Sequence, residues 1–120
     1  MIDHVKIHVA DAALSKAFYV EALAPLGFHV VMEPVPDVVV GMGPRFPELW
    51  IAQSGAPTVA HLAFRADSRE VVDAFHAAGL AAGGRDNGAP GLRPQYHPGY
   101  YGAFVLDPDA NNVEAVHHTF

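Results

Sequence analysis

The chain has 120 residues, 51% of them hydrophobic and 17% charged, which suits one globular domain with a single core and excludes a disordered chain. Its 7 Lys and Arg against 13 Asp and Glu give a net charge of −6, so nucleic acid and anionic membrane surfaces are not expected as partners. Cysteine is absent, so any metal ion must be bound through nitrogen and oxygen. The N-terminus does not resemble a leader peptide and no long apolar stretch occurs, so we expect a cytoplasmic protein.

The first half begins with residues 5–9, where apolar and polar side chains alternate as in a half-buried strand. A helix is expected after Asp11, whose carboxylate suits an N-cap, and Pro25 with Gly27 ends it. Strand patterns follow at about 28–32, 38–42 and 49–52.

The second half follows the same order. Residues 61–65 alternate, and a helix opens near Asp67–Ser68, with Glu70 placed to close a capping box, before it ends at Gly83–Gly84. The Gly- and Pro-rich residues 85–99 are interpreted as a long loop, which in a compact domain is usually a lid or a binding loop. Clear strand patterns occur at 101–106 and 113–117, with a weak one near residue 83.

These two halves repeat each other at an offset of 57 positions. One βαβββ module has an apolar sheet face that it cannot bury alone, so two modules are expected to fold together. We predict an α+β fold in one domain, 1–120, with module one at about 1–56 and module two at about 57–120. The eight strands are expected to form a curved mixed sheet around a cleft. Matching positions include His4 with His61, Phe18 with Phe75, and Leu23 with Leu80.

Two histidines and two glutamates make a candidate metal site. His4 and His61 lie on equivalent faces of equivalent strands, and the last strand of each half carries Glu48 or Glu114. Imidazole and carboxylate ligands suit one divalent ion such as Zn, Fe, Mn, Co or Ni, with a position left open for water or substrate. A single histidine on a strand is more often structural, so it is the pairing across the repeat that favours the metal site.

The predicted loop and the strand after Glu48 supply candidate substrate-binding residues. Arg93 and His97 can bind oxygen-bearing or anionic groups, and Tyr96 and Tyr100 offer rigid faces with a polar tip. Trp50 shares a face with Glu48 and could form a wall of the cleft. The alternative is structural: the loop residues would cap the sheet or contact a second copy, and Trp50 would lie in the core.

Several motifs resemble the vicinal oxygen chelate superfamily, the group of glyoxalases, bleomycin-resistance proteins and extradiol dioxygenases. The resemblance covers nearly the whole chain and implies paired βαβββ modules, a divalent ion, and a small substrate that binds the ion through two neighbouring oxygens. It also implies that His4, His61 and Glu114 are the metal ligands. The motifs are Ile2-Asp3-His4-Val5, Phe18-Tyr19, Leu26-Gly27-Phe28, His61-Leu62-Ala63-Phe64, Asp107-Pro108-Asp109 and Asn112-Val113-Glu114-Ala115-Val116.

Glu48 and Ala110 stand at less certain positions of this pattern. Glu48 fits the position of the fourth metal ligand of glyoxalases, but other members of the superfamily need only His, His and Glu. Glu48 could instead be a general base that moves a substrate proton, or an exposed carboxylate after Pro47. Ala110 replaces a glycine that the superfamily usually has in this turn, so a slightly strained turn is expected.

The favoured function is a metal-dependent lyase, isomerase or transferase of glyoxalase type. A metal-free binding protein of the bleomycin-resistance type is the alternative, and an extradiol dioxygenase a weaker third, because dioxygenases of this group usually have longer chains. A homodimer is expected. Whether His4 and His61 meet within one chain or across two stays open.

Overall fold

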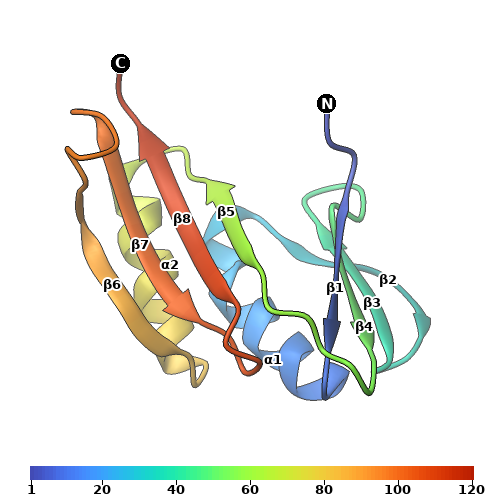
Figure 1. Ribbon diagram of the computed structural model, residues 1–120. Helices are drawn as coiled ribbons and strands as arrows, with labels where there is room; N and C mark the ends of the chain where they lie inside the picture. The colour runs from blue at the N-terminus through green and yellow to red at the C-terminus, as the bar shows by residue number, and fades with distance from the viewer.

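The computed structural model describes all 120 residues and contains two modules with the same order of elements. In Figure 1 the strands of the two modules stand at either side, and both chain ends lie at the same end of the molecule. Module one consists of β1 (Val5–Val9), α1 (Ala12–Ala22), the short 3-10 helix η1 (Ala24–Leu26), β2 (His29–Val35), β3 (Val39–Gly43) and β4 (Leu49–Gln53). Module two consists of β5 (His61–Arg65), α2 (Arg69–Ala81), β6 (Arg85–Leu92), β7 (Tyr100–Leu106) and β8 (Asn112–His118).

The α+β fold with two βαβββ modules is confirmed, but the strands form two sheets rather than one continuous sheet of eight. The strand orders are β1-β4-β3-β2 and β5-β8-β7-β6, with β1 parallel to β4 and β5 parallel to β8. The first strand of each module is thus an edge strand, and no backbone ladder joins β1 to β5. A pocket of about 340 Å³ lies between them instead.

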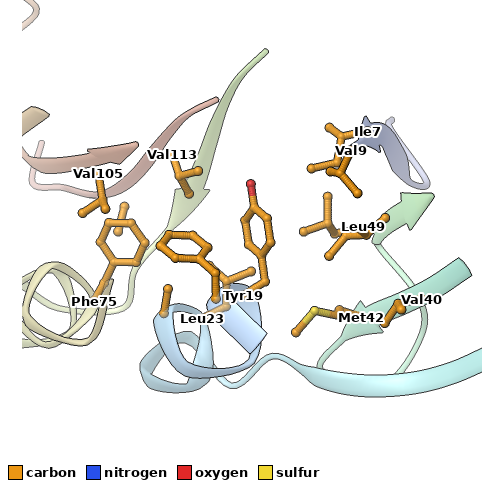
Figure 2. Packing of buried hydrophobic residues seen from close by; sticks show 14 of the residues in the cluster. Ile7, Val9, Tyr19, Leu23, Val40, Met42, Leu49, Phe75, Val105 and Val113 are labelled. Carbon is orange, nitrogen blue, oxygen red and sulfur yellow. The ribbon is translucent and has the colours of Figure 1, made fainter. Parts of the chain in front are cut away.

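Both helices pack between the apolar faces of the two sheets. A single cluster of 18 buried residues includes side chains from both modules, so the two modules share one hydrophobic core. Figure 2 shows Tyr19 of α1 and Leu23, the residue that directly follows this helix, between Val113 on one side and Leu49 on the other. Because successive strand residues point to opposite faces, burial of the apolar face leaves the other face, which carries the candidate site, turned away from the helices.

The prediction of a loop over residues 85–99 is wrong for its first part. Residues Arg85–Leu92 form strand β6, which pairs with β7 through two register shifts, and only residues 93–99 form the loop. Glycine has a low strand propensity, but a Cβ at Gly88 would lie 2.8 Å from Phe104 Cδ2, so the strand needs a glycine at that position.

The helix starts are equivalent in the two modules. Asp11 accepts a hydrogen bond from the backbone N of Leu14 at 3.2 Å, which confirms it as the N-cap of α1. In α2 the N-cap is Ser68, which accepts from the N of Val71 at 3.2 Å, rather than Asp67.

Neither α-helix has the length and apolar character needed to cross a membrane.

The turn before β8 fastens module two to module one. The Asp107 carboxylate accepts from the backbone N of Asn111 at 2.8 Å and of Asp109 at 2.9 Å, and from the Tyr19 hydroxyl of α1 at 2.5 Å. Ala110 has a φ of 65°, in the left-handed region that glycine adopts more easily, so the strained turn expected from the sequence is present.

Candidate functional site

A pocket of about 390 Å³ lies on the face of the second sheet that points away from the helices. Three strands position its residues, because Glu114 on β8 is in register with Ala63 on β5 and with Phe104 on β7. Residues in register point to the same face of a sheet, so the Glu114 side chain and the Phe104 ring share this surface. The lining residues are His61, Tyr96, Tyr100, Phe104, Asn112 and Glu114.

Glu114 is the charged centre of this pocket and is only 2% exposed. Its Oε1 lies 3.1 Å from Nε2 of His61, and its Oε2 accepts a short hydrogen bond from the Tyr100 hydroxyl. A carboxylate removed from water is costly unless such partners compensate for the lost hydration. Burial and the hydrogen bond to Glu114 raise the pKa of Tyr100, so its hydroxyl stays protonated and donating at neutral pH.

The position of the ring proton of His61 determines what its contact with Glu114 requires. His61 Nδ1 lies 3.1 Å from the backbone oxygen of Asn112, which can only accept, so Nδ1 carries the proton. In the neutral ring, Nε2 then presents a lone pair to a carboxylate oxygen. A proton or a cation must lie between these two atoms to make the contact favourable. Their separation also fits two adjacent ligands of a metal ion, whose bonds are about 2.1 Å each.

The corresponding region of the first sheet is more open. His4 precedes β1 with its side chain 52% exposed, and Nδ1 lies 2.6 Å from Oδ1 of Asp3. A carboxylate on one ring nitrogen is the usual support of a metal-ligating histidine, and it leaves Nε2 available. Glu48 lines two pockets together with His4, and Trp50 lines one of them.

The strand register corrects the predicted equivalence of Glu48 and Glu114. Lys6 pairs with Trp50, whereas Ala63, which lies 57 positions after Lys6, pairs with Glu114. Trp50 therefore occupies the position in module one that Glu114 occupies in module two. Glu48 lies just before β4, where its backbone oxygen accepts from the N of Val5, and its side chain is exposed.

The structure does not bring the four predicted metal-site residues together within one chain. His61 and Glu114 are in contact, while His4 and Glu48 line different pockets from that pair. No group of three or more His, Asp or Glu side chains lies close enough to hold a metal ion. Within one chain the candidate ligands therefore lie in two separate groups.

The predicted substrate-binding residues between Arg93 and Tyr100, the first residue of β7, take different places. Tyr96 and Tyr100 line the pocket, with ring centroids 4.9 Å apart. Arg93 does not line it, because its guanidinium donates to the backbone oxygens of Ala89 at 2.7 Å and Gly91 at 2.9 Å.

His97 likewise lies outside the pocket lining and joins the loop to β8. Its Nδ1 accepts from the N of Gly99 at 3.1 Å, so its Nε2 carries the proton and donates to Nδ1 of His118 at 2.9 Å.

The sequence interpretation missed three partners of the candidate ligands. Asp3 could have been found, since a carboxylate directly before a histidine is visible in the chain. The contact between Asn112 and His61 uses a backbone oxygen, which no residue type reveals. Tyr100 was expected to bind substrate, but its hydroxyl is hydrogen-bonded to Glu114.

Comparison with known proteins agrees with the observed fold. Residues 1–115 match the model of the Glyoxalase/Bleomycin resistance protein/Dioxygenase superfamily. The chain belongs to this superfamily. A glyoxalase/bleomycin resistance protein from Albidiferax ferrireducens is 34% identical, with 98% of each chain covered and a TM-score of 0.80.

Solved structures with lower sequence identity share the fold. Lactoylglutathione lyase from Agrobacterium tumefaciens is 21% identical, with 98% of this chain and 92% of that one covered and a TM-score of 0.70. TioX from Micromonospora is 14% identical, with 99% of each chain covered and a TM-score of 0.78. No protein of curated function matches the sequence significantly.

Proposed function

We propose that this protein is a metal-dependent enzyme of glyoxalase type that acts on a small substrate with two neighbouring oxygens. His4, His61 and Glu114 would hold one divalent ion, and the reaction would be of the lyase, isomerase or transferase class. The observation that carries the proposal is the contact between His61 Nε2 and Glu114 Oε1. In the neutral ring both atoms are acceptors, 3.1 Å apart, and a cation between them would satisfy both.

The complete site would form between two copies of the chain. One copy separates His4 from the His61–Glu114 pair, so a second copy would have to supply the missing imidazole. The contacts of His4 support this proposal. Its Nδ1 is in contact with the Asp3 carboxylate, and its Nε2 makes no hydrogen bond within the chain. A symmetric homodimer built in this way would contain two equivalent sites.

In this site, each residue would have a defined task. A bound divalent ion polarises substrate oxygens and lowers the pKa of coordinated water. Glu48 lines the same pockets as His4 and would take a proton from the substrate. Trp50 and Tyr96 would form apolar walls for the substrate. Phe104, which lies beside Glu114 and partly excludes water, would strengthen the electrostatics of the pocket.

Metal analysis of protein purified without chelator tests the ligand set. We expect bound divalent metal in the wild type and its loss in His4→Ala, His61→Ala and Glu114→Ala. His29→Ala, which changes an exposed histidine on β2, is the matched control and should retain the ion. Glu48→Gln should also retain the ion but lose turnover of any compound found active in a screen of neighbouring-oxygen substrates. A metal-free wild type would instead favour the binding-protein alternative.

Mixing two inactive variants tests the shared site. Neither His4→Ala nor Glu114→Ala alone can assemble a complete site. If sites form across the dimer, a heterodimer of the two variants keeps one intact site, with His4 from one copy and the His61–Glu114 pair from the other. Metal binding should then recover to half of the wild-type value per heterodimer. No recovery in isolated heterodimers would exclude the shared site.

A further inference from the structure

We propose that Tyr100 is a positioning residue that fixes which oxygen of Glu114 faces the metal ion. This inference rests on the proposed function, because it assigns a partner to one of the proposed ligands. The Tyr100 hydroxyl donates to Oε2, and His61 lies opposite Oε1. Because Oε2 accepts this hydrogen bond, Glu114 would bind the ion through Oε1 alone. Compared with binding through both oxygens, this leaves one more coordination position for substrate.

The surroundings of Glu114 leave its carboxylate little freedom to turn. Glu114 is 2% exposed, so water does not compete with Tyr100 for Oε2. On the neighbouring strand, a Cβ at Gly102 would lie 3.1 Å from Oε2 and 3.1 Å from Cε1 of Tyr100. The glycine thus creates the space in which the hydroxyl and the carboxylate meet. Rotation that exchanged the two oxygens would break the hydrogen bond in a place where no solvent replaces it.

The ring of Tyr100 is itself held by an aromatic cluster. Its centroid lies 4.9 Å from that of Tyr96, 5.7 Å from that of His97 and 5.2 Å from that of His118. The hydrogen bond between His97 and His118 joins the loop at residues 93–99 to β8, the strand that also carries Glu114. Outer partners that are themselves held in place orient a ligand more accurately than mobile ones.

Two tyrosines at adjacent positions allow a matched experiment. Tyr100→Phe removes the hydroxyl that contacts Glu114. Tyr101→Phe is the control, because its hydroxyl also donates to a carboxylate, Asp73 at 2.7 Å, but belongs to the opposite face of the same strand. The affinity of the dimer for Zn²⁺ is measured by competition with a chromophoric chelator. We expect Tyr100→Phe to weaken binding by about 10- to 100-fold and Tyr101→Phe to leave it unchanged.

The visible spectrum of the Co²⁺-loaded protein separates positioning from a merely structural role. If Glu114 binds through both oxygens once Tyr100 is changed to Phe, the coordination number rises and the ligand-field absorption of Co²⁺ weakens and shifts. Tyr101→Phe should keep the wild-type spectrum. Gly102→Ala, which presses on the same hydrogen bond from the other side, should change the spectrum in the same direction and replaces Tyr100→Phe if that variant does not fold.

The outcomes distinguish this inference from the proposed function. Unchanged Zn²⁺ affinity and Co²⁺ spectrum in Tyr100→Phe would overturn the positioning role while leaving the metal site intact. Equal losses in Tyr100→Phe and Tyr101→Phe would overturn it as well, since the effect would then be general. A wild type that binds neither ion would overturn both the site and the role of Tyr100.

Discussion

The two modules share their backbone plan and differ in how their candidate ligands are held. In module two, Glu114 is buried between His61 and Tyr100. In module one, His4 and Glu48 are exposed, and Trp50 takes the place that mirrors Glu114. The helix starts and the strand pairing are thus the same in the two modules, whereas the candidate ligands are buried and in contact in module two and exposed in module one.

The comparison separates two kinds of position related by the repeat: those with the same role in stability in both modules, and those whose side chains differ on the face that carries the candidate site. Positions that pack the core or start a helix face the same physical demands in both modules. Positions on the faces turned away from the helices do not, because equivalent register positions there carry Trp50 in module one and Glu114 in module two. Matched substitutions at equivalent positions can test this division.

The largest expected effect on stability comes from the equivalent core residues Phe18 and Phe75. Both are at most 1% exposed and lie 57 positions apart, on α1 and α2. Phe18→Ala and Phe75→Ala should each lower the free energy of unfolding by about 3–5 kcal/mol, because each leaves a cavity in the core. Urea unfolding monitored by circular dichroism measures both. A loss in only one variant would show that the modules do not share the core equally.

A smaller effect is expected at Tyr19, where the modules are joined by a hydrogen bond to Asp107. Tyr19→Phe should cost about 1.5–3 kcal/mol, since the acceptor is a buried carboxylate. Burial, and then the charge of Asp107, raise the pKa of Tyr19 well above its usual value. The folded protein therefore retains this proton at pH values where the unfolded chain loses it.

That pKa shift sets the pH dependence of the Tyr19 contribution. It should be complete below about pH 10, the pKa of an unfolded tyrosine, and decrease as the pH rises through the folded-state pKa. Urea unfolding at pH 8 and pH 10.5 should show that wild-type stability falls more steeply with pH than that of Tyr19→Phe. Parallel declines would disprove the contribution.

The smallest effects are expected at the equivalent N-caps, Asp11 and Ser68. Each accepts a hydrogen bond from the third residue after it, at 3.2 Å in both modules. Asp11→Ala and Ser68→Ala should each cost about 1 kcal/mol, read as a lowered urea midpoint with an unchanged slope. Asp67→Ala is the control and should have little effect, because Ser68 rather than Asp67 caps α2.

Local sequence features predicted most elements correctly and failed where tertiary contacts override local preference. One-sided burial produces an apolar pattern that can be read from the sequence. It appears as alternation at 5–9 and 61–65, and as one apolar face on each helix that follows Asp11 or Ser68. Strand β6 was predicted only as a weak pattern near residue 83, and residues 85–92 were assigned to a loop because their Gly- and Pro-rich sequence is typical of one. Pairing with β7 nevertheless holds it extended.

The candidate site shows the same limit. Sequence spacing identified His4, His61, Glu48 and Glu114 as candidate ligands, the family resemblance pointed to the set without Glu48, and the structure places His61 and Glu114 in contact. Spacing also suggested that Glu48 mirrors Glu114, and the register places Trp50 there instead. A shift of two residues preserves which face a side chain is on, so alternation cannot detect it.

By itself, the sequence determined the duplicated βαβββ order, the polar and apolar faces of the first strands, and the residue types able to bind a cation. Only the tertiary structure decided that the strands form two sheets, that Tyr100 is hydrogen-bonded to Glu114, and that His4 lies apart from His61 within a chain. The physical reason is the range of the interactions. Burial patterns follow from the order of apolar and polar residues that are close in the sequence. Strand register and side-chain contacts depend on how segments far apart in the sequence pack together.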